Sequence, residues 1–468
     1  MGKELRSIEP YLPNEPPYRE TLPLDENSPS SEDIYRTLSS PIDVQLEITT
    51  ACNNTCTHCY NYWRGENLSE TTLDEESLYQ VIEELRKNQV FGVNFTGGEP
   101  FLFKEITLKG IKWAREKGIS PSLNTNLTTI ASEDAFRLKE AGIDSVLTSL
   151  LSSNEETHDL ISQRHGSFKR TLTGIKACVD AEIRVWTNMV VTQQNQRQVY
   201  ETGKFVKEIG GQGFSATKAA PCLSCSDFSP LEIDRDSFKK MLEDLLLLER
   251  DLGLEVDSLT AYPLCAIGDG ERLEKFARRS CVGGITALTI GANGEIRPCS
   301  HADITYGNIF QESLSEVWKN MKDWRDGSLL PKACLEECEY FGVCGAGCRM
   351  EAKYQGDIKG KDPLVTGPSD VTSLPSWEIT SVPPDFLEKR VLVNPDLKTR
   401  KEEFGGIMCS RDGLPLFLNE DAYVVILKLK GLISPFTFKE AASNLGLSQD
   451  SSDFFWALFT REVFQEIR

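Results

Sequence analysis

Short apolar runs alternate with longer segments of helical periodicity over the first half of the chain. In the run 43–49, apolar and polar residues alternate, which is the period of a strand with one buried face. In the segment 73–87 the apolar residues recur every three or four positions, so an amphipathic helix is predicted there. Thr72 and Glu75 predict a capping box at the start of that helix.

The same alternation continues to residue 218. Further strands are predicted at 90–95, 120–124, 144–150, 183–192 and 213–218. Further helices are predicted at 104–117, 132–141, 168–181 and 197–209. Six β/α units with short connections favour an α/β fold in which a parallel sheet curls into a partial (β/α)6 barrel of the TIM type. We expect functional groups at the carboxyl ends of its strands.

Composition divides the chain into five parts. Residues 1–40 are rich in Pro, Glu and Ser and predict a poorly ordered or wrapping arm. Residues 41–230 hold the predicted barrel, and 231–356 predict a helical bridge followed by a cysteine-rich region. Repeated prolines among Gly, Ser and Thr predict a linker at 357–384. The last part, 385–468, has its own apolar periodicity and predicts a separate domain.

Charge and composition exclude several classes of partner. The 468 residues carry a formal net charge of −20, which argues against a nucleic-acid backbone or an anionic membrane as the main partner. No apolar run is long enough to cross a membrane, and the N-terminus lacks the pattern of a secretory signal, so we expect a cytoplasmic protein. In that compartment 14 cysteines indicate metal or iron–sulfur sites rather than disulfides.

Three of these cysteines follow the first predicted strand. Cys52, Cys56 and Cys59 have the spacing CxxxCxxC, and the aromatic Tyr60 comes next. Three thiolates are one short of the four that fill a [4Fe–4S] cluster, so one iron would be open to another ligand. Zinc is an alternative occupant, although its structural sites usually have four protein ligands. Three unrelated thiols in a loop are the remaining alternative.

The spacing with its aromatic residue resembles the signature of radical S-adenosylmethionine (SAM) enzymes. In that family the cysteines hold a [4Fe–4S] cluster whose open iron binds SAM, and the reduced cluster cleaves SAM to methionine and a 5′-deoxyadenosyl radical. Gly97-Gly98-Glu99-Pro100 is similar to the family's GGE(P) loop. The resemblance implies that Gly97, Gly98 and Glu99 bind SAM at its amino group, whereas an ordinary strand-to-helix turn is the alternative.

Two further elements resemble the family. Asn124-Thr125-Asn126 is similar to its TNG element, with Leu127 where glycine is common. Thr148-Ser149-Leu150-Leu151 is similar to its SLD element, with Leu151 where Asp is usual. The resemblance implies that Asn126, Ser149 and Arg164 help to bind the cofactor, since a hydroxyl and a guanidinium suit the SAM carboxylate. Alternatively, Ser149 is an ordinary strand residue and Arg164 a surface charge.

A second set of cysteines follows the predicted barrel. Cys281 and Cys299 flank Gly294, which belongs to a predicted hairpin turn. Further along, the spacing CX3CX5CX3C is formed by Cys334, Cys338, Cys344 and Cys348. The whole pattern, with Gly307-Asn308-Ile309 and Val317-Trp318 between its halves, resembles the SPASM extension of radical SAM enzymes. That extension holds two auxiliary [4Fe–4S] clusters; a zinc ribbon at 334–348 is the alternative.

The resemblance also implies how these cysteines divide between the clusters. The first auxiliary cluster would use Cys281, Cys299 and Cys348 together with the upstream Cys265. The second would use Cys334, Cys338 and Cys344, but no cysteine follows Cys348 until Cys409. The second cluster would then have an open or non-cysteine fourth position, which could bind a substrate thiolate, or would take its ligand from Cys409, Cys222 or Cys225.

The remaining cysteines have less specific patterns. Cys222 and Cys225 form a CxxC motif just after the sixth predicted strand. Such a pair could bind metal, bind a substrate group or carry out thiol redox chemistry, or the two could be bystanders. Cys178 lies within a helical pattern and is expected to be buried and inert.

The C-terminal part predicts a β-hairpin at 404–409 and 414–418 around Arg411-Asp412-Gly413, with Pro415 indicating an edge strand. Three helices are predicted at 420–430, 437–445 and 451–460. This order, with the stretch Phe417–Leu427, resembles the winged-helix peptide-recognition domain of the PqqD-like type. The resemblance implies capture of a precursor peptide's leader by strand addition, whereas a winged helix that only packs on the barrel is the alternative.

Together these resemblances imply a maturase of ribosomally synthesised peptides. We expect a 5′-deoxyadenosyl radical to abstract hydrogen from the core peptide and a crosslink, with a thioether favoured, to form. The expected cofactors are SAM and three [4Fe–4S] clusters, with an external one-electron reductant such as flavodoxin or ferredoxin. The alternatives are a sulfatase-maturing or small-molecule or tetrapyrrole-modifying radical SAM enzyme, and a non-catalytic electron carrier or peptide-delivery scaffold. The pattern identifies no general acid or base.

Overall fold

The structure is a computed structural model that describes residues 35–64, 70–222, 227–375, 382–410, 415–447 and 451–467. The described chain divides into two compact units, one that ends at Pro375 and one that begins at residue 382. The predicted arm up to residue 34 and the predicted turn Arg411-Asp412-Gly413 lie outside the described residues.

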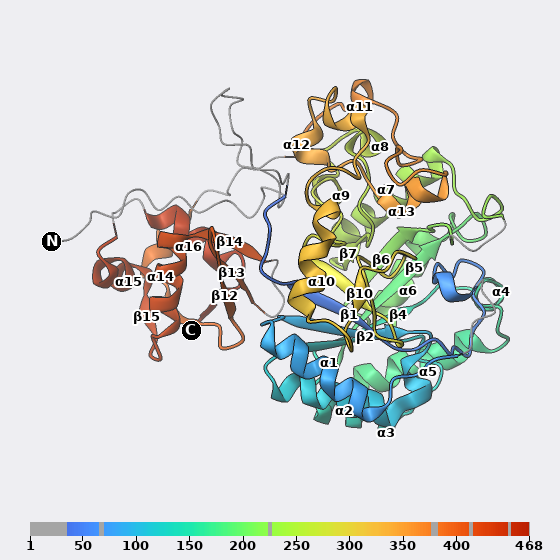
Figure 1. Cartoon of the computed structure of the whole chain (residues 1–468), viewed down its shortest axis with the longest axis horizontal. Coiled ribbons are helices and arrows are strands. Elements are labelled where there is room, and N and C mark those ends of the chain that lie inside the picture. The colour runs from blue at the N-terminus through green and yellow to red at the C-terminus, as the bar shows by residue number, and fades with distance from the viewer. Residues whose placement is uncertain are drawn as a thin grey trace. The chain divides into compact units, whose positions relative to one another are not determined.

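The larger unit is built on a ten-stranded sheet with the order β10-β9-β8-β1-β2-β3-β4-β5-β6-β7 (Figure 1). The strands β1 to β7 run parallel to one another, β8 runs parallel to β1, and β9 and β10 are antiparallel. The first seven strands are β1 Asp43–Thr49, β2 Gly92–Gly97, β3 Ser120–Asn124, β4 Ser145–Ser149, β5 Arg184–Val191, β6 Gly213–Lys218 and β7 Glu255–Asp257. The α/β fold with consecutive parallel strands, as predicted, is confirmed.

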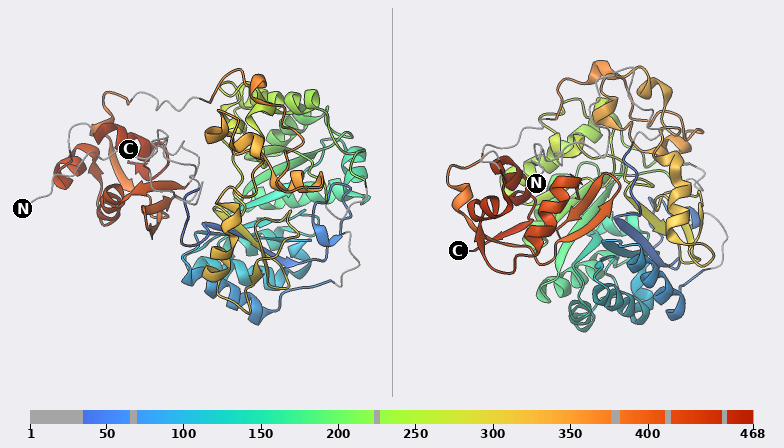
Figure 2. Two further views of the ribbon diagram at one scale, coloured as in Figure 1. Left: turned by 45° about the horizontal axis from the view of Figure 1, so that its top comes forward. Right: turned by 60° about the vertical axis from the view of Figure 1, so that its left-hand side comes forward.

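A helix follows each of these parallel strands up to β6, and neighbouring helices pack along the outside of the sheet (Figures 1 and 2). The helices are α1 Glu75–Lys87, α2 Lys104–Glu116, α3 Ser132–Ala141, α4 Glu155–Ser162, α5 Ser167–Asp180, α6 Val199–Glu208 and α7 Arg235–Leu252. The helix α4 and the strand β7 were not predicted. Each is short, eight and three residues, and a short segment carries too few apolar repeats to show a period.

The predicted capping box at Thr72 and Glu75 is wrong. The N-cap of α1 is Asp74, whose carboxylate accepts a hydrogen bond from the backbone N–H of Ser77 at 2.8 Å. Asp is as good an N-cap as Thr, and starting the helix at Glu75 leaves two acidic residues in its first turn, where the helix dipole favours negative charge. Thr72 instead exchanges a hydrogen bond with the hydroxyl of Thr49, at the end of β1.

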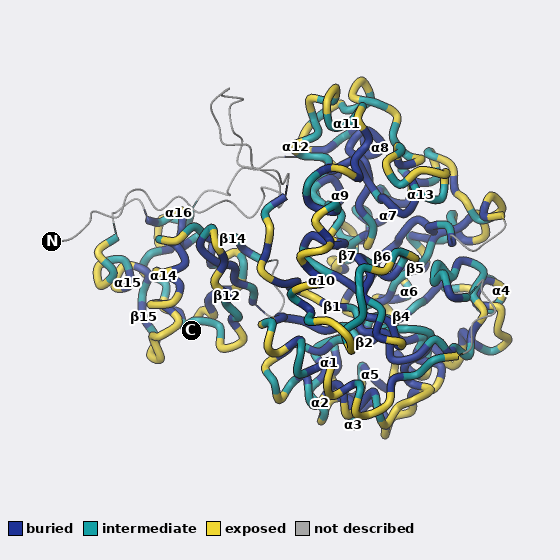
Figure 3. The backbone as a smooth tube through the Cα atoms, in the orientation of Figure 1, coloured by how far each residue is buried: buried dark blue, intermediate teal, exposed yellow. Residues whose placement is uncertain are grey.

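The outer faces of the strands and the helices share one apolar layer. On β5 and β6, Met189, Val191, Phe214 and Ala216 pack in a buried cluster with residues of α6 and α7. The alternate residues of β5, such as Asn188, are only half buried because they lie on the other face of the sheet. Figure 3 shows the central strands mostly in the colours of buried and intermediate residues. The inner face of the barrel therefore carries polar side chains toward the carboxyl ends of the strands.

The rest of the larger unit extends the sheet beyond β1. Its strands are β8 Ala287–Ile290, β9 Glu295–Arg297 and β10 Gly307–Asn308. Its helices are α8 Leu264–Ile267, α9 Glu274–Ala277, α10 Leu314–Asn320, α11 Lys332–Leu335, α12 Phe341–Cys344 and α13 Arg349–Tyr354. The predicted hairpin between β8 and β9 is present, and Gly294 has the positive φ of 85° that its turn requires. Within the predicted arm, Leu38 is buried and its carbonyl accepts a hydrogen bond from the Trp318 indole.

Residues 357–375, which composition assigns to a linker, pack within the larger unit. The backbone N–H of Thr372 donates to the carbonyl of Gly268, and the N–H of Gly270 donates to the carbonyl of Ser373. The carboxylate of Asp362 accepts hydrogen bonds from the backbone of Cys348 and Leu364. Backbone pairing and one buried carboxylate hold this segment, and neither produces an apolar period that sequence reading would detect.

The smaller unit contains two three-stranded antiparallel sheets, with the orders β12-β13-β14 and β15-β11-β16. The strands are β11 Arg390–Val393, β12 Lys398–Glu402, β13 Gly405–Cys409, β14 Leu416–Asn419, β15 Phe436–Thr437 and β16 Phe464–Glu466. The helices α14 Glu420–Lys430, α15 Phe438–Leu445 and α16 Ser452–Phe459 match the three that were predicted. The strands β13 and β14 pair as the predicted hairpin, and β14 is an edge strand, as Pro415 indicated.

Candidate functional site

The loop of Cys52, Cys56 and Cys59 begins three residues after β1 and lies on the helix α4. The backbone N–H of Thr57 donates to the carbonyl of Ile161 at 2.9 Å, and the N–H of Cys59 donates to the carbonyl of Cys56 at 3.2 Å. These bonds fix a loop that the sequence alone leaves undefined. The short helix α4, which was not predicted, therefore serves as the support of the cysteine loop.

The three thiols of this loop lie close enough to interact electrostatically. Burial, together with repulsion from the neighbouring Cys59 and Cys52, raises the pKa of Cys56 to about 12. Burial likewise raises the pKa of Cys52 to about 11. Three thiolates in a buried position require compensating positive charge, which the irons of a cluster would supply. The donor set therefore fits the cluster that the sequence predicts.

The Gly97-Gly98-Glu99 loop is joined to the cysteine loop by backbone contacts. The N–H of Gly98 donates to the carbonyl of Thr49 at 2.6 Å, and the N–H of Glu99 donates to the carbonyl of Ala51 at 2.8 Å. A Cβ atom on Gly98 would lie 2.0 Å from the Ala51 carbonyl oxygen, and one on Gly97 would lie 2.3 Å from that of Thr49. Both glycines are thus needed because their loop passes close to the backbone that leads into the cysteine loop. Ala51, which Gly98 faces, directly precedes Cys52.

We predict that Gly98→Ala displaces the cysteine loop and lowers the iron content by about four atoms per chain, the content of one cluster. Iron determination on anaerobically purified protein measures this loss. Gly342→Ala is the matched control, because a Cβ atom on Gly342 meets no atom within 4 Å. An equal iron content in the two variants would contradict the role given to Gly98.

Glu99 is buried, and its carboxylate accepts hydrogen bonds from other residues of the chain. One oxygen accepts hydrogen bonds from the Thr125 hydroxyl at 2.6 Å and from the Phe101 N–H at 3.0 Å. The other oxygen accepts from the N–H of Asn126 at 2.7 Å. Burial raises the pKa of Glu99, and these three hydrogen bonds oppose the rise. Glu99 therefore connects the end of β2 to the end of β3.

Asn126 continues this connection to the cysteine loop. Its side-chain NH2 group donates to the side-chain oxygen Oδ1 of Asn53 at 2.8 Å, and its own side-chain oxygen accepts from the Thr128 hydroxyl at 2.6 Å. Leu127, where the family commonly has glycine, has φ of 58° and is fully buried. The chain thus retains the left-handed backbone that glycine would supply, at a cost of about 1 kcal/mol or more for a non-glycine residue.

Ser149 and Arg164 are positioned differently from each other. Ser149 is the last residue of β4, half buried, and its hydroxyl makes no hydrogen bond within the described residues. Arg164 is exposed in the loop between α4 and α5, and its backbone alone is bonded, to Asp159 and Ser167. The structure thus brings Gly97, Gly98, Glu99 and Asn126 together at the cysteine loop, whereas Arg164 takes part in no contact with them in the described residues.

Two contacts that the sequence did not reveal join the barrel to the second set of cysteines. The ring of Tyr60, directly after Cys59, lies 3.9 Å from the ring of His301, two residues after Cys299. The buried ammonium of Lys218, the last residue of β6, lies 2.7 Å from the buried carboxylate of Glu351, three residues after Cys348. A charged residue closing an otherwise buried strand was the only signal for Lys218 in the sequence.

Cys281, Cys299 and Cys348 form one group of thiols. Burial, together with repulsion from the neighbouring Cys281, raises the pKa of Cys299 to about 12. The pKa of Cys348 is also raised, by burial, by Glu351, and by Cys281 and Cys299. The guanidinium of Arg349 fixes the backbone around this group by donating to the carbonyls of Ala346, Leu329, Ile358 and Gly360.

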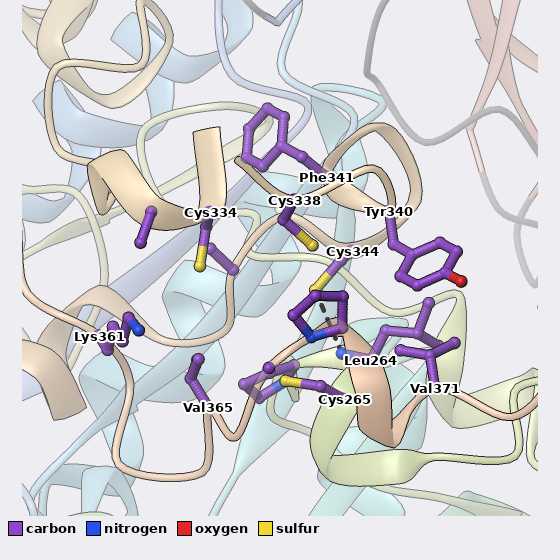
Figure 4. Close-up of a pocket in the computed structure, with 15 residues that line it drawn as sticks. Leu264, Cys265, Cys334, Cys338, Tyr340, Phe341, Cys344, Lys361, Val365 and Val371 are labelled. Atoms are coloured by element: carbon purple, nitrogen blue, oxygen red, sulfur yellow. Dashed lines mark hydrogen bonds between the residues drawn. The ribbon is translucent and has the colours of Figure 1, made fainter. Parts of the chain in front are cut away.

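Cys265 does not accompany that group. It lines a cavity together with Cys334, Cys338 and Cys344, and Figure 4 shows the sulfur atoms of all four directed into it. The Cys344 sulfur accepts a hydrogen bond from the N–H of Leu264 at 3.1 Å, which holds Cys344 beside α8. The sequence grouped Cys265 with Cys281, Cys299 and Cys348, but the structure places it in the other group. No spacing rule predicts which group a cysteine 16 residues upstream of Cys281 will join.

The other predicted cysteines lie as follows. Cys222 is buried, and its thiol donates to the carbonyl of Asn61 at 3.8 Å. The pKa of Cys59 is raised, mainly by burial and in smaller part by repulsion from Cys222. Cys225 lies outside the described residues. Cys178 is fully buried in α5, as predicted, and burial raises its pKa to about 12.

No set of three or more His, Cys, Asp or Glu side chains in the described ranges has the geometry of a single-metal site. A single zinc ion draws its sulfur ligands to about 2.3 Å from one centre. In a [4Fe–4S] cluster each thiolate binds a different iron, so the sulfur atoms stand further apart.

Comparison with family models identifies two regions of the chain. Residues 46–206 match the radical SAM superfamily, and residues 281–348 match the iron–sulfur cluster-binding SPASM domain. Within the described ranges, each helix is too short or too polar to span a bilayer.

Among curated proteins, the AdoMet-dependent heme synthase of Methanosarcina barkeri is 26% identical over 346 residues, which is 69% of this chain and 96% of the relative. The antilisterial bacteriocin subtilosin biosynthesis protein AlbA of Bacillus subtilis is 26% identical over 66% of this chain and 68% of its own length. Among solved structures, Streptococcus suis SuiB bound to S-adenosylmethionine has a TM-score of 0.58 at 19% identity, covering 70% of this chain and 77% of SuiB. SuiB has also been solved with its precursor peptide SuiA, with a TM-score of 0.57 at 17% identity, over 72% of this chain and 76% of that one.

Proposed function

We propose that this enzyme, whose residues 46–206 form a radical SAM domain and whose residues 281–348 form a SPASM domain, modifies a ribosomally synthesised precursor peptide. SAM, a SAM-binding [4Fe–4S] cluster and auxiliary clusters are its cofactors. When bound, they supply the 5′-deoxyadenosyl radical that removes a hydrogen atom from the substrate. The observation that carries the proposal is the separate C-terminal unit, in which β14 is the last of the described strands of its sheet and can serve as a place for a peptide.

Within the barrel, the proposed ligands of the SAM-binding cluster are Cys52, Cys56 and Cys59. Gly97 and Gly98 hold the backbone of the next loop against them, and Glu99 with Asn126 fixes that loop to β3. The hydroxyl of Ser149, at the end of β4, is free to meet the SAM carboxylate. Arg164, which is exposed, would reach the same carboxylate from the loop before α5. An external one-electron reductant such as flavodoxin or ferredoxin supplies the electron.

The smaller unit would bind the leader of the precursor peptide. Among the described strands, β14 is the last strand of its sheet, the position at which an extended peptide can be added to a sheet. The next element, α14, exposes apolar side chains at Val424 and Leu427, which are 39% and 44% exposed and one helical turn apart. Ile433, just beyond α14, is 94% exposed. An edge strand followed by an exposed apolar helix face suits an extended peptide with apolar side chains.

The leader site is tested by replacing Val424 and Leu427 together with glutamate. Charges on this face should weaken binding of the precursor peptide at least tenfold, in fluorescence anisotropy with a labelled leader, because apolar contacts are lost. Phe136→Glu is the matched control, since Phe136 is a 57% exposed apolar residue of α3 in the other unit. Unchanged affinity in the double variant would exclude this face from leader binding.

The heme synthase relatives favour a second candidate, a tetrapyrrole-modifying enzyme. This chain covers 96% of the Methanosarcina barkeri relative, so nearly all of that protein has a counterpart here. The match leaves just under a third of this chain without a counterpart in that relative. The reason to prefer the peptide is the separate smaller unit, with β14 as the last of its described strands and exposed apolar side chains on α14.

The proposed function is tested by co-expressing the protein with a small peptide encoded beside its gene and measuring the mass of the peptide. A crosslink, of which a thioether from a peptide cysteine is the favoured form, should appear as the loss of two hydrogens. An unmodified peptide, together with turnover of a tetrapyrrole by the purified enzyme, would contradict the proposal and favour the second candidate.

A further inference from the structure

The four-cysteine cavity contains a complete set of ligands for one cluster. Cys334 comes from α11, Cys338 from the turn after it, Cys344 from the end of α12 and Cys265 from α8. Their sulfur atoms face one cavity that is otherwise lined by apolar groups such as Pro263 and Phe341 (Figure 4). We propose that Cys265, Cys334, Cys338 and Cys344 hold one auxiliary [4Fe–4S] cluster, and that Cys281, Cys299 and Cys348 hold the other, with one iron for which the described residues place no fourth cysteine.

Backbone contacts hold Cys265 in its place. The Cys265 sulfur accepts a hydrogen bond from the N–H of Thr366 at 3.4 Å, and the Cys265 carbonyl accepts one from the Thr366 hydroxyl at 3.2 Å. The Arg235 guanidinium donates to the same carbonyl at 2.9 Å. Val365, Gly367, Pro368 and Val371 line the cavity next to this contact. The segment 361–371 therefore closes the four-cysteine cavity and keeps Cys265 facing the other three thiols.

A sharp turn separates the two groups. Gly345, Ala346 and Gly347 have φ of 64°, 61° and 76°, so three successive residues adopt the left-handed conformation between Cys344 and Cys348. A Cβ atom on Gly347 would lie 2.6 Å from a carboxylate oxygen of Asp362, the same oxygen that accepts from the Cys348 N–H at 2.7 Å. This turn sends Cys344 toward Cys265 and Cys348 toward Cys281 and Cys299.

The consequence is that the open iron belongs to the group whose neighbouring residues contact the residue after Cys59. Four thiolates occupy all irons of a cubane cluster, whereas three leave one iron for another ligand. The three-cysteine group adjoins the barrel through the Tyr60–His301 ring contact and through the Lys218–Glu351 ion pair. This proposal rests on the cofactors of the enzyme and does not depend on the peptide substrate.

The assignment is tested by the iron content of single variants. Three thiolates suffice to hold a cluster and two do not, so a four-cysteine site should survive one alanine substitution and a three-cysteine site should not. With three clusters the wild-type chain binds about 12 irons. Cys334→Ala and Cys265→Ala should keep that number, and Cys281→Ala, Cys299→Ala and Cys348→Ala should each lower it by about four.

The double variants complete the test. Adding Cys265→Ala to Cys334→Ala should remove about four irons, because only two ligands remain at that site. Adding Cys178→Ala to Cys334→Ala is the matched control and should remove none. The reverse result, in which Cys334→Ala loses a cluster and Cys281→Ala does not, would assign Cys265 to the three-cysteine group and overturn the proposal. Cys299 and Cys348 lie on other elements than Cys281, so a folding failure of one variant leaves the others to decide.

A second measurement does not depend on losing a cluster. Adding a small thiol, 2-mercaptoethanol, to the reduced wild-type protein should shift the electron paramagnetic resonance signal of one auxiliary cluster, the one with an open iron. In Cys265→Ala the other auxiliary signal should shift as well. If Cys265→Ala instead gains no thiol response at the second signal, Cys265 is not a ligand of that cluster.

Discussion

Replacing Cys52, Cys56 and Cys59 together with alanine should abolish the formation of 5′-deoxyadenosine. Without these thiolates no cluster is held beside Gly97 and Gly98, and SAM has no iron to bind. The variant should also contain about four fewer irons than the wild type, with the auxiliary clusters retained. Chromatographic assay of the nucleoside after reduction with dithionite measures the first effect, and iron determination measures the second.

Cys178→Ala serves as the control for the triple variant. Cys178 is buried in α5 and lies in neither set of thiols, so its replacement should leave both iron content and nucleoside formation intact. Continued production of 5′-deoxyadenosine by the triple variant would contradict the assignment of Cys52, Cys56 and Cys59 as ligands of the SAM-binding cluster. Loss of the nucleoside in both variants would indicate a general effect of removing cysteines.

Replacing Arg297 with methionine should lower the free energy of unfolding by about 3–5 kcal/mol, because it leaves a buried carboxylate without its partner. The Arg297 guanidinium lies 2.6 Å from the Glu47 carboxylate, and the two side chains are 1% and 2% exposed. Arg297 also donates to the Ala302 carbonyl at 3.0 Å and lies 4.9 Å from the ring of Tyr62. It thus joins β9, at the start of the SPASM region, to β1 of the barrel.

An exposed ion pair provides the matched control for Arg297. Arg137 pairs with Glu105 at 2.7 Å, but the two side chains are 35% and 66% exposed, so Arg137→Met should cost less than about 1 kcal/mol. Urea unfolding of both variants under anaerobic conditions compares the two losses. A Glu47→Leu/Arg297→Met double variant should recover much of the loss, since it removes the unpaired buried charge. Equal losses in Arg297→Met and Arg137→Met would refute the role assigned to burial.

The barrel could be predicted from the sequence because its strands and helices differ in period. In β1 and β6 the predicted bounds are those of the structure, and the amphipathic helices of the barrel, such as α1 and α2, were found. The sheet order followed from the rule that consecutive β/α units pack side by side. The carboxyl ends of β2 and β3 therefore came together at the cysteine loop, as Gly98 and Asn126 show.

The cluster grouping could not be predicted in the same way. It depends on where α8 and the segment 361–371 pack. Individual hydrogen bonds and turns fix these residues, and such contacts leave no repeating pattern of apolar residues in the sequence. The same reason explains why residues 357–375 resembled a linker. Glu99 illustrates a further limit, because a sequence shows that a carboxylate is present but not that Thr125, Phe101 and Asn126 already occupy its oxygens.

The buried charges were also beyond prediction. Glu47 lies within an apolar strand and Lys218 at the end of another, and their partners Arg297 and Glu351 are far along the chain. Such pairs form only when two distant segments fold together, so no local pattern indicates them.

The most direct test of the proposed chemistry follows the abstracted hydrogen. A precursor peptide in which the carbon-bound hydrogens are replaced by deuterium is incubated anaerobically with the reduced protein and SAM, and the 5′-deoxyadenosine is analysed by mass spectrometry. The proposed function predicts nucleoside that carries deuterium from the peptide, in amounts that match the modified peptide. Unlabelled nucleoside alongside a modified peptide, or labelled nucleoside from the Cys52/Cys56/Cys59 triple variant, would contradict it.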